Sequence, residues 1–162
     1  MIKIITVTEY NKAVADRIRQ LLIQLSRSGK DKGEIPQEWF EQLISSPWHD
    51  CLLAVDLAED SNTKQDLLIL PEQILGMASV SVIFGAGIGK NAYLEDFVVD
   101  QSARGKGVGH LIFQAYENWA REKGCKNLEF TCGQGREAAQ QFYRDHGADT
   151  YDTNFFRKKL DN

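Results

Sequence analysis

The stretch from Leu94 to Gly109 constrains the fold of this chain more than any other segment. Its first half, residues 94–99, is rich in β-branched and aromatic residues, which is typical of a strand. Its second half has three glycines at alternate positions, Gly105, Gly107 and Gly109. Residues 110–120 then place apolar side chains at helical spacing. The predicted order is therefore strand, glycine-rich turn and helix.

The turn has the properties of an anion-binding site. A helix N-terminus presents backbone N–H groups without intrahelical partners, and the macrodipole makes that end positive. Glycines remove the side chains that would keep an anion away from those groups. Arg104 and Lys106 add two mobile positive charges. The sequence therefore predicts a site for a phosphate or pyrophosphate.

Three phosphate-binding motifs compete for this turn. A Walker loop requires Ser or Thr after Gly-Lys, but Gly107 follows Gly105-Lys106. A dinucleotide fingerprint fits Gly105 and Gly107, but its third glycine position holds His110. The third motif, (Arg/Gln)-x-x-Gly-x-(Gly/Ala), matches in full through Arg104, Gly107 and Gly109. It is the acetyl-CoA loop of the GNAT N-acetyltransferases, which the chain therefore resembles.

The resemblance extends from about Ile74 to the C-terminus. A later helix of the family usually carries Ala-x-x-Phe-Tyr, a spacer and Gly, and residues 139–147 read Ala-Gln-Gln-Phe-Tyr-Arg-Asp-His-Gly. The family's last strand often ends Phe-x-Lys-x-Leu, and residues 156–160 are similar to it. The resemblance implies an α/β fold of the GNAT type over residues 1–162 as a single domain. Its mixed, mainly antiparallel central sheet would be flanked by helices and splayed between strands four and five.

The resemblance also implies an activity. Acetyl-CoA would be the acyl-donor cosubstrate, and the acetyl group would move to a primary amine of a small molecule by direct transfer in a ternary complex. Acetylation of a protein or peptide, and a CoA-binding sensor without catalysis, are the alternatives. The residues implied to bind the cofactor are Phe97, Val98, Val99, Arg104, Gly105, Lys106, Gly107, Val108, Gly109, Arg136 and Ala139. Arg136 stands where many members have Asn, so its partner would be a CoA phosphate or a substrate anion.

Tyr143 occupies the family's tyrosine position, which implies a general acid for the leaving thiolate. The resemblance further implies a bulge in strand four that frees backbone N–H groups near Val98 and Val99. Glu95 and Asp96 are the candidate bases, although a water chain is a third route. Adjacent strand residues point to opposite faces unless a bulge intervenes. We favour Glu95, which would share a face with Tyr93 and Phe97.

Composition limits the remaining possibilities. The net charge of −4 argues against a general nucleic-acid binder. Three cysteines without a zinc spacing suggest neither a disulfide framework nor a metal site, and they fit a reducing cytoplasm. Cys132 is more simply a packed cysteine than an acyl carrier. The apolar run at residues 1–7 is too short for a signal peptide or membrane span. A homodimer is compatible with the family, but no interface is specified.

The remaining elements follow from periodicity and turn residues. Strands are expected at 2–7, 51–57, 74–84, 92–99 and 126–132, with two short final strands after residue 149. Helices are expected after a cap at Thr8 or Asn11, from Pro36, at 107–122 and at 136–146. Residues 58–73 form an excursion between two strands. Trp39, Phe40 and Trp48 are expected to pack in the core, unless one of them lines the expected acceptor pocket. Glu34, Glu38 and Glu41 form an acidic group near that pocket.

Overall fold

The structure is a computed structural model that describes residues 1–26, 28–57 and 69–160. The chain divides into two compact units, Met1–Phe130 and Thr131–Asn162. The predicted excursion at 58–73 lies mostly outside the described residues, and its end forms a 3-10 turn, η1 (Pro71–Gln73). No helix in the described part is both long and apolar enough to cross a bilayer.

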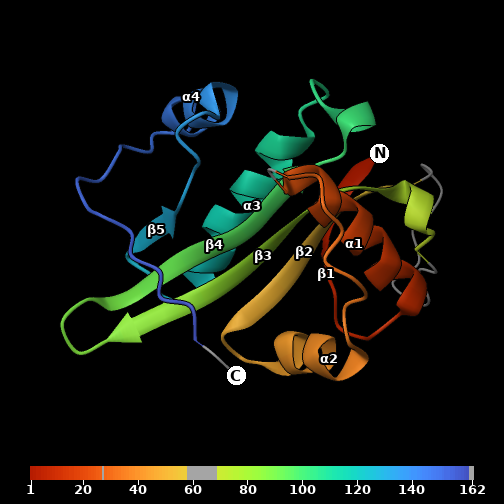
Figure 1. The fold of residues 1–162 in the computed structure, drawn as a ribbon, viewed down its shortest axis with the longest axis horizontal. Helices are drawn as coiled ribbons and strands as arrows, with labels where there is room; N and C mark the ends of the chain where they lie inside the picture. Colours follow the sequence, from red (N-terminus) through yellow and green to blue (C-terminus); the bar gives the residue numbers. More distant parts are fainter. Residues whose placement is uncertain (27, 58–68, 161–162) are drawn as a thin grey trace. The chain divides into compact units, whose positions relative to one another are not determined.

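The larger unit is built on a five-stranded sheet in the order β1-β2-β3-β4-β5 (Figure 1). The strands are β1 (Ile2–Thr6), β2 (His49–Asp56), β3 (Ile74–Gly85), β4 (Gly89–Val99) and β5 (Asn127–Phe130). The first four pair antiparallel, whereas β5 runs parallel to β4 because a helix connects the two. The predicted mixed, mainly antiparallel sheet is therefore confirmed.

Helices cover both faces of this sheet (Figure 1). One face packs against α1 (Lys12–Leu25) and α2 (Gln37–Ser45), and the other packs against α3 (Val108–Glu122). Asn11 caps α1, since its side-chain oxygen accepts from the N–H groups of Ala13 at 2.9 Å and Val14 at 3.2 Å. The core on the α1 side includes the buried side chains of Ile18, Leu21, Phe40, Leu53 and Met77.

The smaller unit contains one helix, α4 (Glu137–Asp145), followed by Gly147 at φ +80°. Residues 148–160 form neither helix nor strand, so the two predicted final strands are wrong. Phe156 and Leu160 are 88% and 75% exposed. Their aromatic and apolar character suggested a strand, but a strand forms only where its backbone groups find a hydrogen-bonded neighbour.

Candidate active site

The glycine-rich turn adopts a conformation that only glycine tolerates well. Gly105 and Gly107 have φ angles of +74° and +79°, and Gly107 is the N-cap of α3. An added Cβ at either position would meet no atom within 4 Å, so the turn is open to an approaching ligand. These glycines are therefore required by the backbone conformation, and their missing side chains leave the helix end accessible.

Positive groups converge at this end of α3. The helix begins at the buried Val108, and the backbone N–H groups of its first turn make this end of the helix positive. The side chains of Arg104 and Lys106 are exposed beside the turn. Arg104 also donates from Nε to the carbonyl of Val99 at 3.3 Å. The structure thus brings the predicted residues 104–109 together as an anion-binding turn.

The turn follows a strand edge that is open to a ligand. Pairing between β4 and β5 ends at Leu94 and Phe130, while β4 continues to Val99. Residues 95–99 therefore extend beyond the part of that edge which β5 covers. In an extended strand, alternate N–H and C=O groups point to such an edge. This segment can therefore exchange backbone hydrogen bonds with an extended ligand.

The expected bulge lies at Glu95 instead of near Val98 and Val99. Ser79 pairs with Asp96 and Val80 pairs with Leu94, so Glu95 is the extra residue on β4. Val98 and Val99 stay in register with β3. The end of β4 thus extends beyond β5 because β5 stops early, and the bulge has a different effect, on side-chain direction.

The bulge places both candidate bases on the sheet face that carries α1 and α2. Glu95 accepts a hydrogen bond at 3.3 Å from the hydroxyl of Ser81, which pairs with Tyr93. Asp96 lies opposite Ser79, whose other neighbour, Cys51, belongs to the core on the α1 side. Without the extra residue, the two carboxylates would point to opposite faces.

The expectation that Glu95 shares a face with Phe97 is wrong, because the bulge reverses the alternation between them. Phe97 packs against Phe113 of α3, with ring centroids 6.4 Å apart, on the other face of the sheet. The shared face with Tyr93 is as predicted, since Tyr93 pairs with Ser81.

The charge of Glu95 affects its neighbour Asp96. Burial, followed by the negative charge of Glu95, raises the pKa of Asp96, while Lys32 opposes the change. Burial also raises the pKa of the Cys51 thiol to about 12, with a smaller effect from the charge of Asp96. Asp96 therefore holds a proton more readily than an ordinary aspartate, and Cys51 stays a thiol at neutral pH.

In the smaller unit, the residues predicted from the family motif lie on and beside α4. Arg136 is the N-cap residue, and Ala139 and Tyr143 share one face because they are four residues apart. Burial raises the pKa of Tyr143 to about 12, with Cys132 adding to the effect and Arg136 opposing it. The phenol is therefore protonated at neutral pH, which is the state required of an acid.

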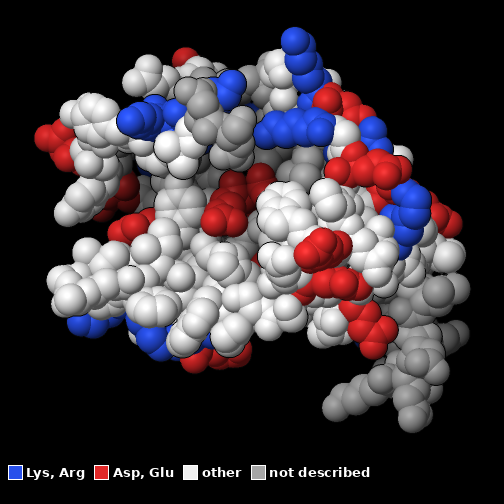
Figure 2. Space-filling view, turned by 60° about the horizontal axis from the view of Figure 1, so that its bottom comes forward, with Lys and Arg blue, Asp and Glu red and all other residues white. Residues whose placement is uncertain are grey.

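Figure 2 shows acidic side chains gathered over α2, where Glu38 and Glu41 are exposed. Trp39 on the same helix is 60% exposed and Trp48 is 37% exposed. Core packing was therefore the wrong expectation for these two tryptophans, whereas Phe40 is buried as predicted. The outer side of α2 thus combines negative charge with an exposed indole.

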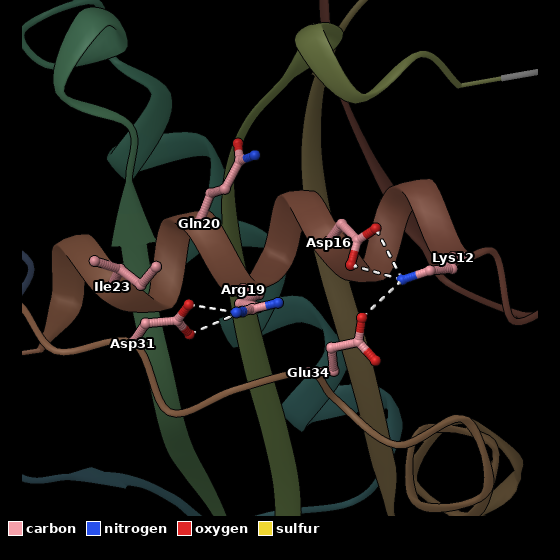
Figure 3. Close-up of a pocket in the computed structure, with 7 residues that line it drawn as sticks. All are labelled: Lys12, Asp16, Arg19, Gln20, Ile23, Asp31 and Glu34. Carbon is pink, nitrogen blue, oxygen red and sulfur yellow. Dashed lines mark hydrogen bonds and ion pairs between the residues drawn. The ribbon is translucent and has the colours of Figure 1, made fainter.

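Both cations that line a pocket on the outer side of α1 are paired with carboxylates of the same pocket (Figure 3). Lys12 lies 3.2 Å from Asp16 and 3.3 Å from Glu34. Arg19 pairs with Asp31 through two hydrogen bonds, which joins α1 to the loop ahead of α2. None of residues 104–109 lines this pocket. Its paired charges hold the loop against the helix, so we assign it no phosphate.

Sequence reasoning missed a buried ion pair between α1 and the segment that leads into the turn. Arg17 Nη2 lies 2.7 Å from Asp100 Oδ2, and the two side chains are 15% and 11% exposed. The available signal was local, because Asp with Ser two residues later is a common turn signature. The partner, Arg17, is 83 residues away in the chain.

The model of the acetyltransferase (GNAT) family matches residues 32–148, which is more than half of the chain. The chain belongs to this family. A solved structure of the aminoglycoside acetyltransferase meta-AAC0020, from an uncultured soil metagenomic sample, has the same fold. Its TM-score is 0.75 at 18% identity, and the match covers 98% of this chain and 97% of that one.

Two further GNAT proteins bear on the site. The structure of AAC(6')-Iy in complex with the bisubstrate analog CoA-S-monomethyl-acetylneamine matches with a TM-score of 0.69 and 20% identity, over 99% of both chains. The thialysine N-epsilon-acetyltransferase of Bos taurus is 26% identical over 103 residues, which are 64% of this chain and 57% of that protein. The chain spans about half the length of the curated relatives it matches.

Proposed function

We propose that this protein transfers an acetyl group from acetyl-CoA to a primary amine of a small molecule, by direct transfer in a ternary complex. The observation that carries the proposal is the anion-binding turn, residues 104–109, which follows a stretch of β4 that β5 does not cover. The turn suits the pyrophosphate of CoA, and the edge of β4 suits the extended, amide-containing pantetheine arm.

The reaction assigns a task to each group. Glu95 removes a proton from the acceptor ammonium, and the free amine attacks the thioester carbonyl. Backbone N–H groups at the end of β4 stabilise the negative charge that develops on the carbonyl oxygen. The C–S bond then breaks, and Tyr143 donates its proton to the leaving thiolate. Asp96 is the alternative base, because the bulge sets it on the same face as Glu95.

The acceptor is proposed to be a cationic small amine. By their names, the relatives act on thialysine and on aminoglycosides. Two lines of support come from this chain, the paired carboxylates on β4 and the exposed acidic side of α2. Negative charge on this side raises the local concentration of a cationic acceptor.

The test begins with calorimetric binding of acetyl-CoA, followed by release of free thiol in the presence of thialysine, aminoglycosides, amino sugars, aminophosphonates and peptides. Arg104→Met should weaken acetyl-CoA binding by about tenfold, because it removes a charge beside the pyrophosphate turn. Arg121→Met is the matched control, since Arg121 is another exposed arginine, at the opposite end of α3. It should change the affinity less than about twofold.

The outcomes separate the candidate functions. Failure of the wild-type protein to bind acetyl-CoA would refute the proposal. Thiol release with a peptide, and with none of the small amines, would show that the acceptor is a peptide or protein. Binding without thiol release for any acceptor would favour a CoA sensor.

A further inference from the structure

Asp100 is the centre of a buried hydrogen-bond network at the start of the anion-binding turn. It directly follows β4 and caps the short 3-10 turn η2 (Gln101–Ala103). Its Oδ1 accepts from the N–H of Ser102 at 2.8 Å and from the Ser102 hydroxyl at 2.6 Å. Its own N–H donates to the carbonyl of Leu75 on β3 at 2.8 Å. The carboxylate thus fixes the direction in which the chain leaves the sheet.

Two side chains of α1 complete the network. Arg17 donates to Asp100 Oδ2 at 2.7 Å and, from Nη2 and Nε, to the carbonyl of Ile74 at 2.9 and 3.3 Å. Gln24 donates to Asp100 Oδ2 at 3.1 Å and accepts from the N–H of Gln101 at 3.0 Å. The carboxylate therefore receives four hydrogen bonds, and two of them come from a helix that is distant in the sequence.

The turn itself has few restraints of its own between its two ends. Gly105 and Gly107 have no side chains, and no atom lies within 4 Å of where a Cβ would be. The C-terminal end is fixed by the buried Val108 at the start of α3. The N-terminal end is fixed by η2, which directly precedes Arg104 and is capped by Asp100. The spacing of the backbone donors therefore depends on how firmly Asp100 is held.

We propose that Arg17 and Asp100, assisted by Gln24, are positioning residues for acetyl-CoA. They hold the phosphate-binding turn in its binding conformation by fixing the point at which the chain leaves β4. The proposal rests on the proposed function for its ligand. None of the three residues is assigned a contact with the cofactor. Their effect is to preorganise the N–H groups and the Arg104 side chain before the ligand arrives.

Arg17→Met and Asp100→Asn test the proposal, with Arg19→Met as the matched control. Arg19 lies two residues from Arg17 on the same helix and also pairs with an aspartate, Asp31, but outside the network (Figure 3). Arg17→Met and Asp100→Asn should raise KM for acetyl-CoA by about tenfold or more, with kcat changed less than about threefold. Arg19→Met should leave both constants within about twofold. Arg17→Lys should bind acetyl-CoA more tightly than Arg17→Met, because lysine keeps the positive charge but lacks the forked guanidinium group.

Amide hydrogen exchange without ligand tests the positioning independently of the proposed function. Exchange of the amides at 101–111 should accelerate by about tenfold in Arg17→Met and Asp100→Asn, and not in Arg19→Met. Gln24→Leu, which leaves the ion pair intact, should give a smaller acceleration and serves if the other variants do not fold. Unchanged exchange at 101–111 in the folded network variants would overturn the inference. Faster exchange in a protein that binds no acetyl-CoA would support the positioning and refute the ligand.

Discussion

Gly76 of β3 lies close to both β4 and α3. It is buried and pairs with Val99. A Cβ built on it would lie 2.7 Å from the carbonyl oxygen of Val98, 2.9 Å from Cδ1 of Ile112 and 3.3 Å from Cα of Val99. The isoleucine methyl group can move aside by rotation, but the two β4 atoms belong to the backbone. Gly76→Ala therefore forces β4 itself to shift.

The expected cost follows from two opposing effects. Overpacking of this kind costs about 1–3 kcal/mol. Replacing Gly by Ala recovers about 0.4–1 kcal/mol, because the unfolded chain becomes less flexible. The net loss in the free energy of unfolding is about 1–2 kcal/mol, which corresponds to a fall in Tm of about 2–8 °C. The shift should also raise KM for acetyl-CoA, because it moves the strand proposed to bind pantetheine.

Gly87→Ala is the matched control. Gly87 lies in the exposed turn between β3 and β4, and a Cβ there would meet nothing within 4 Å. Its free energy of unfolding should be unchanged or slightly higher. Calorimetric melting of both variants and of the wild type measures the difference. If Gly76→Ala melts at the wild-type temperature or above, the close approach to Val98 does not exist and the packing argument is refuted.

The remaining predictions concern the catalytic candidates and Asp100. Tyr143→Phe should lower kcat by about 10²–10⁴ with little change in KM. Because the pKa of Tyr143 is raised to about 12, wild-type kcat should show no alkaline loss from this residue below about pH 11. Thiol-release rates measured across pH decide both points. Glu95→Gln should reduce kcat most near neutral pH, where the carboxylate is ionised and the acceptor amine is protonated, and less at alkaline pH, where the amine is already free. A larger effect from Asp96→Asn would reassign the base. The Ser102 hydroxyl, with Arg17 and Gln24 adding to it, holds the pKa of Asp100 well below its usual 3.8. The ionised Asp100 carboxylate therefore contributes its full stability above about pH 4, and this contribution is lost as the pH falls below about 4. Denaturant titrations in acid should show a smaller loss for Asp100→Asn than for the wild type.

The sequence was most informative where a backbone conformation strongly favours one residue type, as a positive φ favours glycine. Gly105 and Gly107 mark the left-handed turn, and Gly124 and Gly147 follow the ends of α3 and α4 at positive φ. The alternation of apolar residues also located all five strands to within a few positions. These signals are local, so no knowledge of distant partners was needed.

The sequence predicted less well those features that depend on pairing between distant segments. The position of the bulge at Glu95 depends on the register of β4 against β3, which the sequence of β4 alone does not determine. The Arg17–Asp100 pair needed the docking of α1 to be known. Residues 156–160 carry strand-forming side chains but make no strand. The roles of the site residues, the single-domain organisation, a cytoplasmic location and a homodimer stay predictions.

The part of the β4 edge that β5 does not cover also bears on how the protein avoids aggregation. An open strand edge accepts a strand from another molecule as readily as it accepts a ligand, which is a common route to association. Here the open part is short, residues 95–99, and it begins with a bulge and two adjacent carboxylates. A bulge twists an edge away from a straight partner strand, and adjacent negative charges repel the same segment of a second copy. The irregularity that turns Glu95 and Asp96 to one face therefore also protects the edge from other chains.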